Sequence, residues 1–336
     1  MSGHERFGEA VAHPNLALVK YWGKRDRALN LPATGSISIS MGAFRTRTAV
    51  EFGSDRGADE VVLNGETADG GTSTRISEFL DLVRTEAGLD GVAAKVTSEN
   101  DFPTAAGLAS SSSAFAALGV AACHAAGLEP TTTELSLLSR RGSGSAARSI
   151  FGGFVEMRLG NRSDGQDAVA EQLAGAEHWD IRIVIAVTDP RPKRVGSTEG
   201  MELTRKTSPY YAGWVDTSGE DLRRARDAVK SRDLSALGEV AEHSALKMHA
   251  CTLAAQPGIL YWRGGTVEAM HAVREMRSAG HGAWFTVDAG PHVKVLCMPD
   301  DVDAIGERLR SIPGVTDVLV SNVGAPASLI DAAKEV

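Results

Sequence analysis

Alternating apolar and polar residues near the N-terminus predict two strands with a short connection. The segments ISISMGAF (37–44) and TRTAVEF (46–52) both place apolar side chains at alternate positions, with only one residue between them. A helix is predicted over 72–89, because apolar residues recur there at intervals of three and four positions: Ile76, Phe79, Leu80 and Val83. The segment AAKVTSEN (93–100) then predicts a further strand.

The middle of the chain carries two predicted helices and a buried strand. Residues 112–127 are apolar nearly all round, which is typical of a buried helix. Residues 132–142 predict a second helix with a threonine N-cap. The apolar run IRIVIAV (181–187) predicts a fully buried strand, and the helix- and strand-breaking sequence TDPRPK follows it. We place a boundary between two lobes just before this strand.

The second half mixes helices and strands without regular alternation. Helices are predicted at 219–230, 233–255, 266–278 and 300–312. Residues 284–298 predict a strand, a tight turn and a second strand, and residues 315–323 predict the last strand. Irregular mixing of this kind indicates an α+β class rather than a doubly wound sheet.

Length, charge and cysteine content narrow the class of protein. A chain of 336 residues is long for one core, which favours two lobes, 1–180 and 181–336. The net charge of −8 argues against nucleic-acid binding, so an anionic ligand would need a local cluster of cations. Three widely spaced cysteines predict reduced core thiols, and no apolar run reaches membrane-spanning length. We therefore expect a cytoplasmic protein that binds neither nucleic acid nor membrane.

The segment PTAAGLASSSSAF (103–115) predicts a phosphate-binding helix start. Free amides at a helix N-terminus favour an anion, Gly107 permits close backbone approach, and four serines from Ser110 offer hydroxyls. The alternative is an ordinary serine-capped helix with a small-residue packing face. The spacing and the lysine of a P-loop are absent from this segment.

Three other stretches carry candidate chemistry. In RRGSGSAARS, Arg148 follows Ser143 and Ser145 by about one helical turn and suits a carboxylate or phosphate, although a solvated surface arginine is the alternative. Lys20 lies in the apolar run ALVKYW, where it meets an anion or extends to water from an edge strand. Asp288, before a Gly-Pro turn, is either an ordinary turn residue or a carboxylate held at the floor of a cleft.

These stretches in their order and spacing resemble one family, the mevalonate diphosphate decarboxylases of the GHMP kinase superfamily. The motifs that carry the resemblance are LALVKYWGK, SENDFPTAAGLASSSSAFAAL, SRRGSGSAARSIFGGFVEM, STEGM and VDAGPHVKVL. The family implies a GHMP kinase fold with a left-handed β-α-β unit in the N-terminal lobe and the active-site cleft between two lobes. It further implies ATP as co-substrate, Mg²⁺, mevalonate 5-diphosphate as substrate and a homodimer.

The resemblance also implies residue roles. Asp288 contacts the substrate 3-hydroxyl as general base or orienting group, Lys20 lies near this hydroxyl and the transferring phosphoryl group, and Arg148 holds the substrate carboxylate. The further substrate-binding residues implied are Tyr21, Lys24, Ser143, Ser145, Ser197 and Thr198, with added positive charge from Lys193 and Arg194. The ATP-binding residues implied are Ser98, Asn100, Pro103, Ala105, Ala106, Gly107, Leu108, Ala109, Ser110 and Ser111, with Ser110 or Ser111 near Mg²⁺.

Two departures from the family pattern keep alternatives open. His292 stands where the family usually has asparagine, which introduces possible pH sensitivity. Thr198 stands where some relatives carry an arginine for the diphosphate, which weakens the preference for a diphosphate over a monophosphate. The alternative activities are a phosphomevalonate decarboxylase or a kinase that stops at 3-phosphorylation, and the non-enzymatic alternative is an inert ligand sensor.

Overall fold

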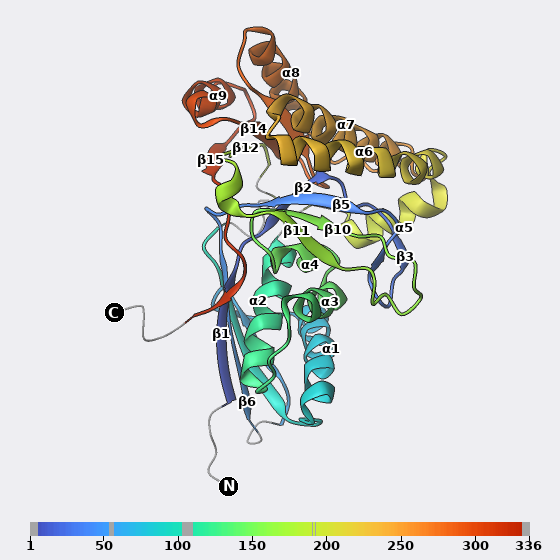
Figure 1. Cartoon of the computed structure of the whole chain (residues 1–336), viewed down its shortest axis with the longest axis vertical. Coiled ribbons are helices and arrows are strands. Elements are labelled where there is room, and N and C mark those ends of the chain that lie inside the picture. The colour runs from blue at the N-terminus through green and yellow to red at the C-terminus, as the bar shows by residue number, and fades with distance from the viewer. Residues whose placement is uncertain (1–5, 54–56, 103–109, 190, 192, 331–336) are drawn as a thin grey trace.

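The computed structural model describes residues 6–53, 57–102, 110–189, 191 and 193–330. These residues form one six-stranded sheet, two four-stranded sheets and a two-stranded ribbon. Helices lie above and below the central four-stranded sheet (Figure 1). The ribbon pairs β3 (Lys24–Asp26) with β4 (Leu31–Pro32). The predicted α+β class is therefore confirmed.

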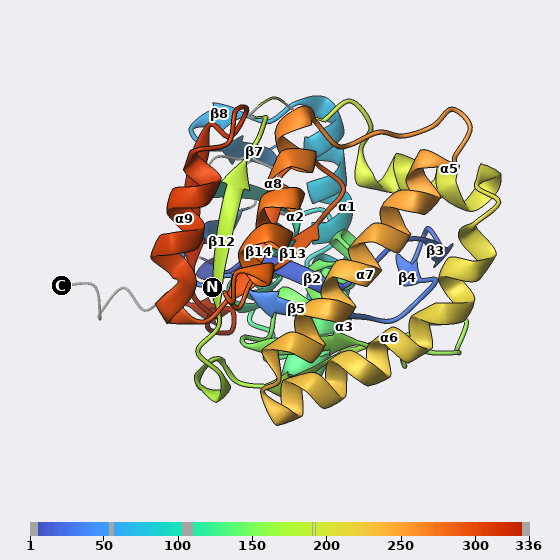
Figure 2. The same ribbon diagram turned by 90° about the horizontal axis from the view of Figure 1, so that it is seen from above.

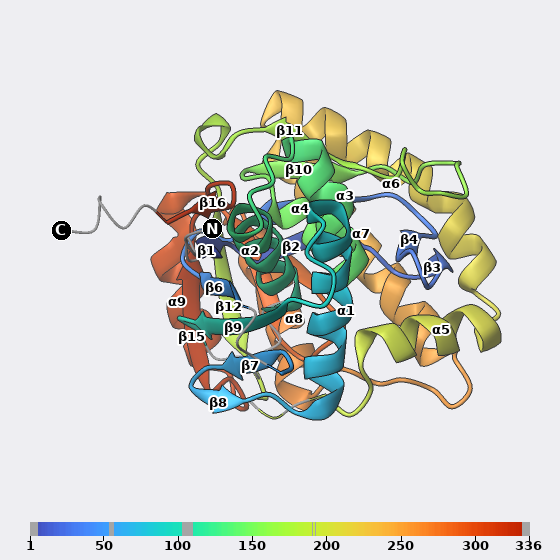
Figure 3. The ribbon, with the colours of Figure 1, turned by 90° about the horizontal axis from the view of Figure 1, so that it is seen from below.

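The six-stranded sheet belongs mainly to the first half of the chain. Its strands in spatial order are β16 (Ser328–Leu329), β1 (Arg6–Ala12), β6 (Thr46–Gly53), β9 (Ala93–Asn100), β7 (Glu60–Leu63) and β8 (Glu66–Thr67). All neighbours are antiparallel except β7 and β9. Two helices cover one face, α1 (Gly70–Ala87) and α2 (Ser110–Ala125) (Figure 3). Gly8 on β1 lets α2 pack closely on this strand, since a side chain at Gly8 would meet the Ala121 carbonyl of α2.

The second sheet lies at the centre of the molecule. Its strands in order are β11 (Ala170–Ala174), β10 (Phe154–Met157), β5 (Ser36–Ser40) and β2 (Asn15–Val19). Figure 1 shows α3 (Thr132–Gly142) and α4 (Ala146–Ser149) below this sheet and α6 (Tyr211–Ser231) and α7 (Leu234–Leu253) above it. Because both faces are covered, every residue of β5 is buried, its serines included.

The third sheet belongs to the second half. Its strands in order are β13 (Trp284–Val287), β14 (Val293–Cys297), β12 (Arg182–Val187) and β15 (Asp317–Ser321), all antiparallel. From above, α8 (Gly264–Ser278) and α9 (Val302–Arg310) flank β12 (Figure 2). One further helix, α5 (Ser197–Thr207), stands apart from this sheet, and short 3-10 turns occupy 176–178 and 299–301.

One hydrophobic core joins the two halves. It includes Leu16 and Ile37 from the central sheet, Ile183 from β12, and Ala225 and Leu237 from α6 and α7, all of them inaccessible to solvent. The C-terminal strand β16 also returns to pair with β1. The division of the chain at residue 181 stays a prediction.

Several element predictions are confirmed, and the differences have physical causes. Helix α3 has the predicted bounds, and Thr131 caps it in a reciprocal pair with Glu134. Helix α5 and the first turns of α6 were not predicted, because polar residues dominate 197–218 and hide the apolar spacing. The predicted strand over Lys20 ends at Val19, so Lys20 and the next residues form an irregular segment.

Candidate active site

A large cavity lies where the central sheet, α5 and the turn after β13 meet. It has a volume of about 1160 Å³. Basic side chains outnumber acidic ones in its lining: Lys20, Lys24, Arg27, Arg75, Arg148, Arg191, Lys193 and Lys206, against Glu199, Glu202 and Asp288. In a chain with an overall charge of −8, this lining forms a local positive site suited to an anionic ligand.

Asp288 lies between two buried ammonium groups. Lys20 Nζ donates to its Oδ1 at 2.6 Å, and Lys294 Nζ donates to its Oδ2 at 3.1 Å. The lysine side chains are 2% and 1% exposed, whereas Asp288 keeps 25% exposure where it lines the cavity. Lys20 is fixed by a second bond from Nζ to the Ala17 carbonyl at 2.8 Å. Both oxygens of the carboxylate are thus held, and the carboxylate still faces the cavity.

These neighbours set the charge of Asp288. Burial alone would raise the pKa of this carboxyl, but Lys20 and Lys294 outweigh burial and hold the pKa well below its ordinary value. Burial lowers the pKa of Lys20, and the Asp288 carboxylate opposes that effect. The Asp288 carboxyl group is therefore ionised at neutral pH.

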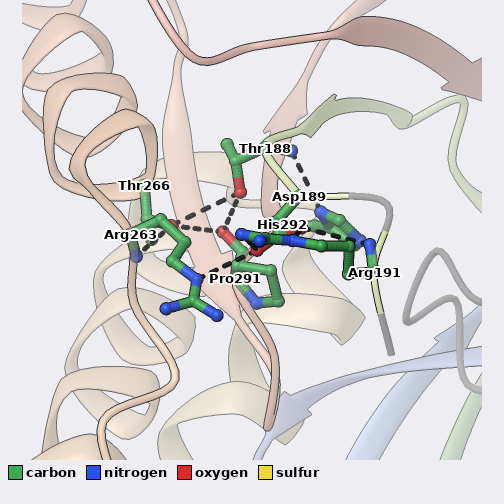
Figure 4. Close-up of polar contacts among 7 residues, drawn as sticks. All are labelled: Thr188, Asp189, Arg191, Arg263, Thr266, Pro291 and His292. Atoms are coloured by element: carbon green, nitrogen blue, oxygen red, sulfur yellow. Dashed lines mark hydrogen bonds and ion pairs between the residues drawn. The ribbon is translucent and has the colours of Figure 1, made fainter. Parts of the chain in front are cut away.

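The turn that carries Asp288 is anchored by β12 and α8 (Figure 4). The Pro291 carbonyl accepts from the hydroxyls of Thr188 at 2.7 Å and Thr266 at 2.6 Å. His292 Nδ1 accepts from the Thr188 backbone N–H at 3.1 Å. Burial, followed by Lys294, lowers the pKa of His292 to about 3, so its ring is neutral near pH 7. The histidine therefore acts here as a hydrogen-bond acceptor in the turn.

Arg148 lines the same cavity, and its hydrogen-bond partners among the described residues are neutral. Its guanidinium donates to Asn15 Oδ1 at 3.0 Å, to Ser36 Oγ at 2.6 Å and to Ser38 Oγ at 2.9 Å. Its Cζ lies 6.0 Å from the centre of the Tyr21 ring. Burial lowers the pKa of Arg148 to about 10, which still leaves it charged at neutral pH. Among the described residues no carboxylate forms an ion pair with it.

Gly144, the second glycine of the GSGS run, makes room for Tyr21. A side chain at Gly144 would come within 2.3 Å of the Tyr21 hydroxyl oxygen. This hydroxyl is buried at the cavity wall and has no hydrogen-bond partner among the described residues. Ser143 and Ser145 flank the glycine, and their hydroxyls lie 3.3 Å apart. The structure therefore brings the hydroxyls of Tyr21, Ser143 and Ser145 together at the cavity wall.

Further cations line the cavity around these hydroxyls. Lys24 donates to Asn30 Oδ1 at 2.6 Å, and burial, followed by Arg75 and Arg27, lowers its pKa to about 8. Lys193 donates to Ser197 Oγ at 2.7 Å. Thr198 also lines the cavity, whereas Arg194 is exposed and does not line it.

A second cavity of about 520 Å³ adjoins the first. Its lining includes Ser98 and Asn100, and it shares Ser110, Ser111 and Arg75 with the larger cavity. The predicted ATP-binding residues 103–109 lie outside the described residues: Pro103, Ala105, Ala106, Gly107, Leu108 and Ala109. The structure thus places the other predicted ATP-binding residues around a hollow next to Asp288 and Arg148.

Some residues of the site were not predicted from the sequence. Lys294 interrupts the apolar strand VKVLC, and this signal was available but not used. Ser36 and Ser38 alternate with isoleucines and become informative only once both faces of β5 are known to be buried. Asn15 gave no sequence signal, because its contact with Arg148 joins positions 133 residues apart.

The donor groups fit a magnesium ion that arrives with nucleotide phosphates. Among the described residues there is no group of three or more His, Cys, Asp or Glu side chains suited to hold a metal. Mg²⁺ commonly retains waters and binds through phosphates and few protein ligands. Ser110 and Ser111, at the junction of the cavities, offer hydroxyls for such an ion.

Family models match both halves of the chain. The Diphosphomevalonate decarboxylase-like N-terminal domain matches residues 12–170, and the Mevalonate 5-diphosphate decarboxylase C-terminal domain matches residues 183–330. The diphosphomevalonate decarboxylase of Aspergillus fumigatus is 35% identical over 322 residues, covering 90% of this chain and 80% of that protein. The phosphomevalonate decarboxylase of Haloferax volcanii is 34% identical over 323 residues, covering 96% of this chain and 97% of that protein.

Solved structures agree with this assignment. The mevalonate diphosphate decarboxylase of Staphylococcus aureus superposes with a TM-score of 0.92 at 39% identity, covering 98% of this chain and 99% of that chain. The solved complex of MDDEF with MVAPP, AMPPCP and magnesium superposes with a TM-score of 0.91 at 38% identity, covering 98% of this chain and 100% of that chain. The fold is therefore the GHMP kinase fold, and the chain is an ATP-dependent enzyme. The chain belongs to the mevalonate diphosphate decarboxylase family, and the resemblance seen in the sequence is confirmed.

None of the helices in the described part of the chain is long and apolar enough to cross a membrane.

Proposed function

We propose that the protein uses ATP to convert mevalonate 5-diphosphate into isopentenyl diphosphate, ADP, phosphate and CO₂. One observation carries the proposal. The ionised Asp288–Lys20 pair and the guanidinium of Arg148, which lacks a carboxylate partner among the described residues, line one cavity next to a second hollow containing Ser98 and Asn100. Family membership and the ligands named for the related complex support the same reaction.

In the first step the substrate 3-hydroxyl oxygen attacks the γ-phosphorus of ATP. The new P–O bond forms as the bond to the ADP oxygen breaks, and the hydroxyl proton leaves toward the Asp288 carboxylate or a phosphate oxygen. Asp288 accepts the hydrogen bond that orients the hydroxyl for in-line attack. Lys20, 2.6 Å from Asp288, offsets negative charge on the transferring phosphoryl group.

In the second step the new phosphate ester leaves and CO₂ is lost. The C–O bond between C3 and phosphate breaks, and its electron pair leaves with the phosphate. The bond between the carboxylate carbon and the neighbouring CH₂ carbon also breaks, and its electron pair forms the new double bond between this carbon and C3. Arg148 holds the substrate carboxylate in place, since its guanidinium is already oriented by Asn15, Ser36 and Ser38. A fixed carboxylate keeps the breaking bond aligned with the leaving group.

The diphosphate end of the substrate meets hydroxyls and cations. Tyr21, Ser143 and Ser145 supply hydroxyls, and Lys24 supplies a cation. Ser197 and Thr198, at the start of α5, line the same cavity. Ser98 and Asn100 in the smaller cavity would hold the nucleotide, and Ser110 or Ser111 would hold Mg²⁺, which would neutralise phosphate charge when bound.

A second candidate activity is the decarboxylation of mevalonate 5-phosphate. Thr198 lines the cavity and adds no charge for a second phosphate. The Haloferax volcanii relative, named phosphomevalonate decarboxylase, matches 96% of this chain, almost its full length. The diphosphate is favoured by the surplus of cations in the cavity, Lys24 and Lys206 among them.

A substrate panel tests the proposal. Mevalonate, its 5-phosphate and its 5-diphosphate are each supplied with ATP and Mg²⁺, and both ADP and CO₂ are measured. We expect equal amounts of the two products, with the highest kcat/KM for the diphosphate. ADP without CO₂ would identify a kinase, a preference for the 5-phosphate would identify the second candidate, and turnover by Asp288→Ala equal to the unmodified protein would overturn the assigned site.

Two predictions about the protein's setting stay open. We propose a cytoplasmic homodimer, on the ground that the family implies a dimer and that Cys123, Cys251 and Cys297 are free, buried thiols. Sedimentation velocity tests the dimer.

A further inference from the structure

Lys294 is a buried ammonium that does not line the substrate cavity. It lies on β14, six residues after Asp288 and across the anchored turn, and its side chain is 1% exposed. Its Nζ donates to Asp288 Oδ2 at 3.1 Å, and Asp288 is its only ion-pair partner among the described residues. The cavity lining contains Lys20 and Asp288 but not Lys294. Lys294 therefore contacts the carboxylate from behind.

An ammonium at this position is costly for the fold. On the face of the sheet that carries Lys294, its cross-strand neighbour Ile185 and its next neighbour along β14, Leu296, both belong to the apolar core that joins the two halves. Removing a lysine from water costs several kcal/mol, and an apolar side chain often stabilises such a position more than an ion pair does. Packing therefore does not explain Lys294, whereas its bond to Asp288 does.

The two lysines donate to different oxygens of the Asp288 carboxylate. Lys20 bonds to Oδ1 and lines the cavity, whereas Lys294 bonds to Oδ2 from the protein side. With Oδ2 held, rotation about the Asp288 side chain is restricted, and the oxygen beside Lys20 stays directed at the ligand. A second cation also opposes the effect of burial on the charge of the carboxylate.

We propose that Lys294 is a positioning residue for the reaction, which acts through Asp288 by fixing its orientation and keeping it ionised. The role rests on the proposed function, because Asp288 must first be the group that orients the 3-hydroxyl. Lys294 itself touches neither substrate nor nucleotide. Its removal should therefore lower kcat while leaving KM for both substrates nearly unchanged.

The test compares Lys294→Met, Lys294→Gln and Lys294→Arg with a matched control. Lys247→Met also removes an ion pair of a partly buried lysine, with Asp221 at 2.5 Å, but at a place that does not line the cavity. For each variant kcat, KM, Tm and the dependence of kcat on pH from about 5 to 8 are measured. Lys294→Gln keeps a hydrogen-bond donor without charge, so it serves if the methionine variant does not fold.

The expected result is a fall in kcat of about tenfold or more for the Met and Gln variants, the change that one pKa unit of ion pairing corresponds to. Their activity should also begin to fall at a higher pH on acidification, because Asp288 loses a cation that opposes its protonation. Lys294→Arg should recover part of kcat and the original acid behaviour, and Lys247→Met should change Tm alone. An unchanged kcat, or a loss of kcat with unaltered acid behaviour and no recovery by arginine, overturns the proposal.

The unmodified protein separates the two levels of inference. If it releases no CO₂ from either phosphorylated mevalonate, the proposed function fails on its own, whatever the variants do. If it is active and the Lys294 variants behave like Lys247→Met, only the positioning role fails.

Discussion

At the scale of single residues, the site depends on buried charges that are stable only in one another's company. From the apolar run around it, Lys20 was predicted either to meet an anion or to extend to water from an edge strand, and the structure shows the anion. Its partner could not be predicted by spacing, since Asp288 lies 268 positions away. Only the family resemblance linked the two residues before the structure placed them 2.6 Å apart.

Lys24 should make substrate capture sensitive to alkaline pH. Because its pKa is lowered to about 8, the ammonium is present below that pH and is lost as pH rises through it. An anionic substrate then loses an attractive charge, so kcat/KM should decline above about pH 8. Lys24→Arg, which remains charged, should retain kcat/KM into more alkaline solution. A decline of equal size in both proteins would contradict this assignment.

His292→Asn should leave the reaction nearly intact. The ring is neutral near pH 7 and accepts from the Thr188 N–H, and an asparagine side-chain oxygen can accept the same bond. We expect kcat and its dependence on pH between about 6 and 8 to be unchanged. His292→Leu leaves the Thr188 N–H unpaired and should lower the free energy of unfolding by about 1–3 kcal/mol. Loss of a kcat transition in His292→Asn would show that the ring titrates during turnover.

At the scale of elements, strand β5 illustrates what a pattern can and cannot say. Its isoleucine–serine alternation predicted a strand, and the strand is present. Both of its faces are buried, and Arg148 uses Ser36 and Ser38 on the polar face as acceptors. Alternation therefore fixed the element but not its surroundings, which depend on helices from distant parts of the chain.

Replacing both β5 serines should loosen Arg148 without removing it. In Ser36→Ala/Ser38→Ala the guanidinium loses two of its acceptors, at a cost of about 1–3 kcal/mol for each donor left unpaired. We expect a higher KM for the mevalonate substrate, an unchanged KM for ATP and a lower Tm.

The background for this test is Arg148→Met. If the two serines act only through the guanidinium, adding their replacement to Arg148→Met should raise the substrate KM no further. An additive rise in KM would mean that the serines contribute to binding independently of Arg148.

At the scale of the whole molecule, the first and the last strand of the described residues lie side by side in one sheet. The short strand β16 pairs with β1, and the Ile330 N–H donates to the Glu9 carbonyl at 2.8 Å. Neither strand was predicted from the sequence, because β1 is interrupted by a glycine and β16 has only two residues. Their pairing became visible only when the sheet was assembled, although the α+β class was predictable from the order of the longer elements.

Truncation tests the contribution of this pairing. A chain that ends after residue 327 loses β16 and should unfold with a free energy lower by about 1–3 kcal/mol, as backbone groups of β1 lose their partners. A chain that ends after residue 330 keeps the strand and is the matched control. Because β16 does not line either cavity, both chains should have the kcat of the full chain. Equal stability of the two truncated chains in urea would refute the expectation.

The core that runs through both halves has a mechanical consequence. Leu16, Ile183 and Leu237, each inaccessible to solvent, belong to one apolar cluster with members from both halves, so a swing of one half against the other would break these contacts. Such a swing would expose apolar surface to water, which is unfavourable. We therefore expect ligand entry and product exit to move groups at the rim of the cavity and to leave the charges around Asp288 in place.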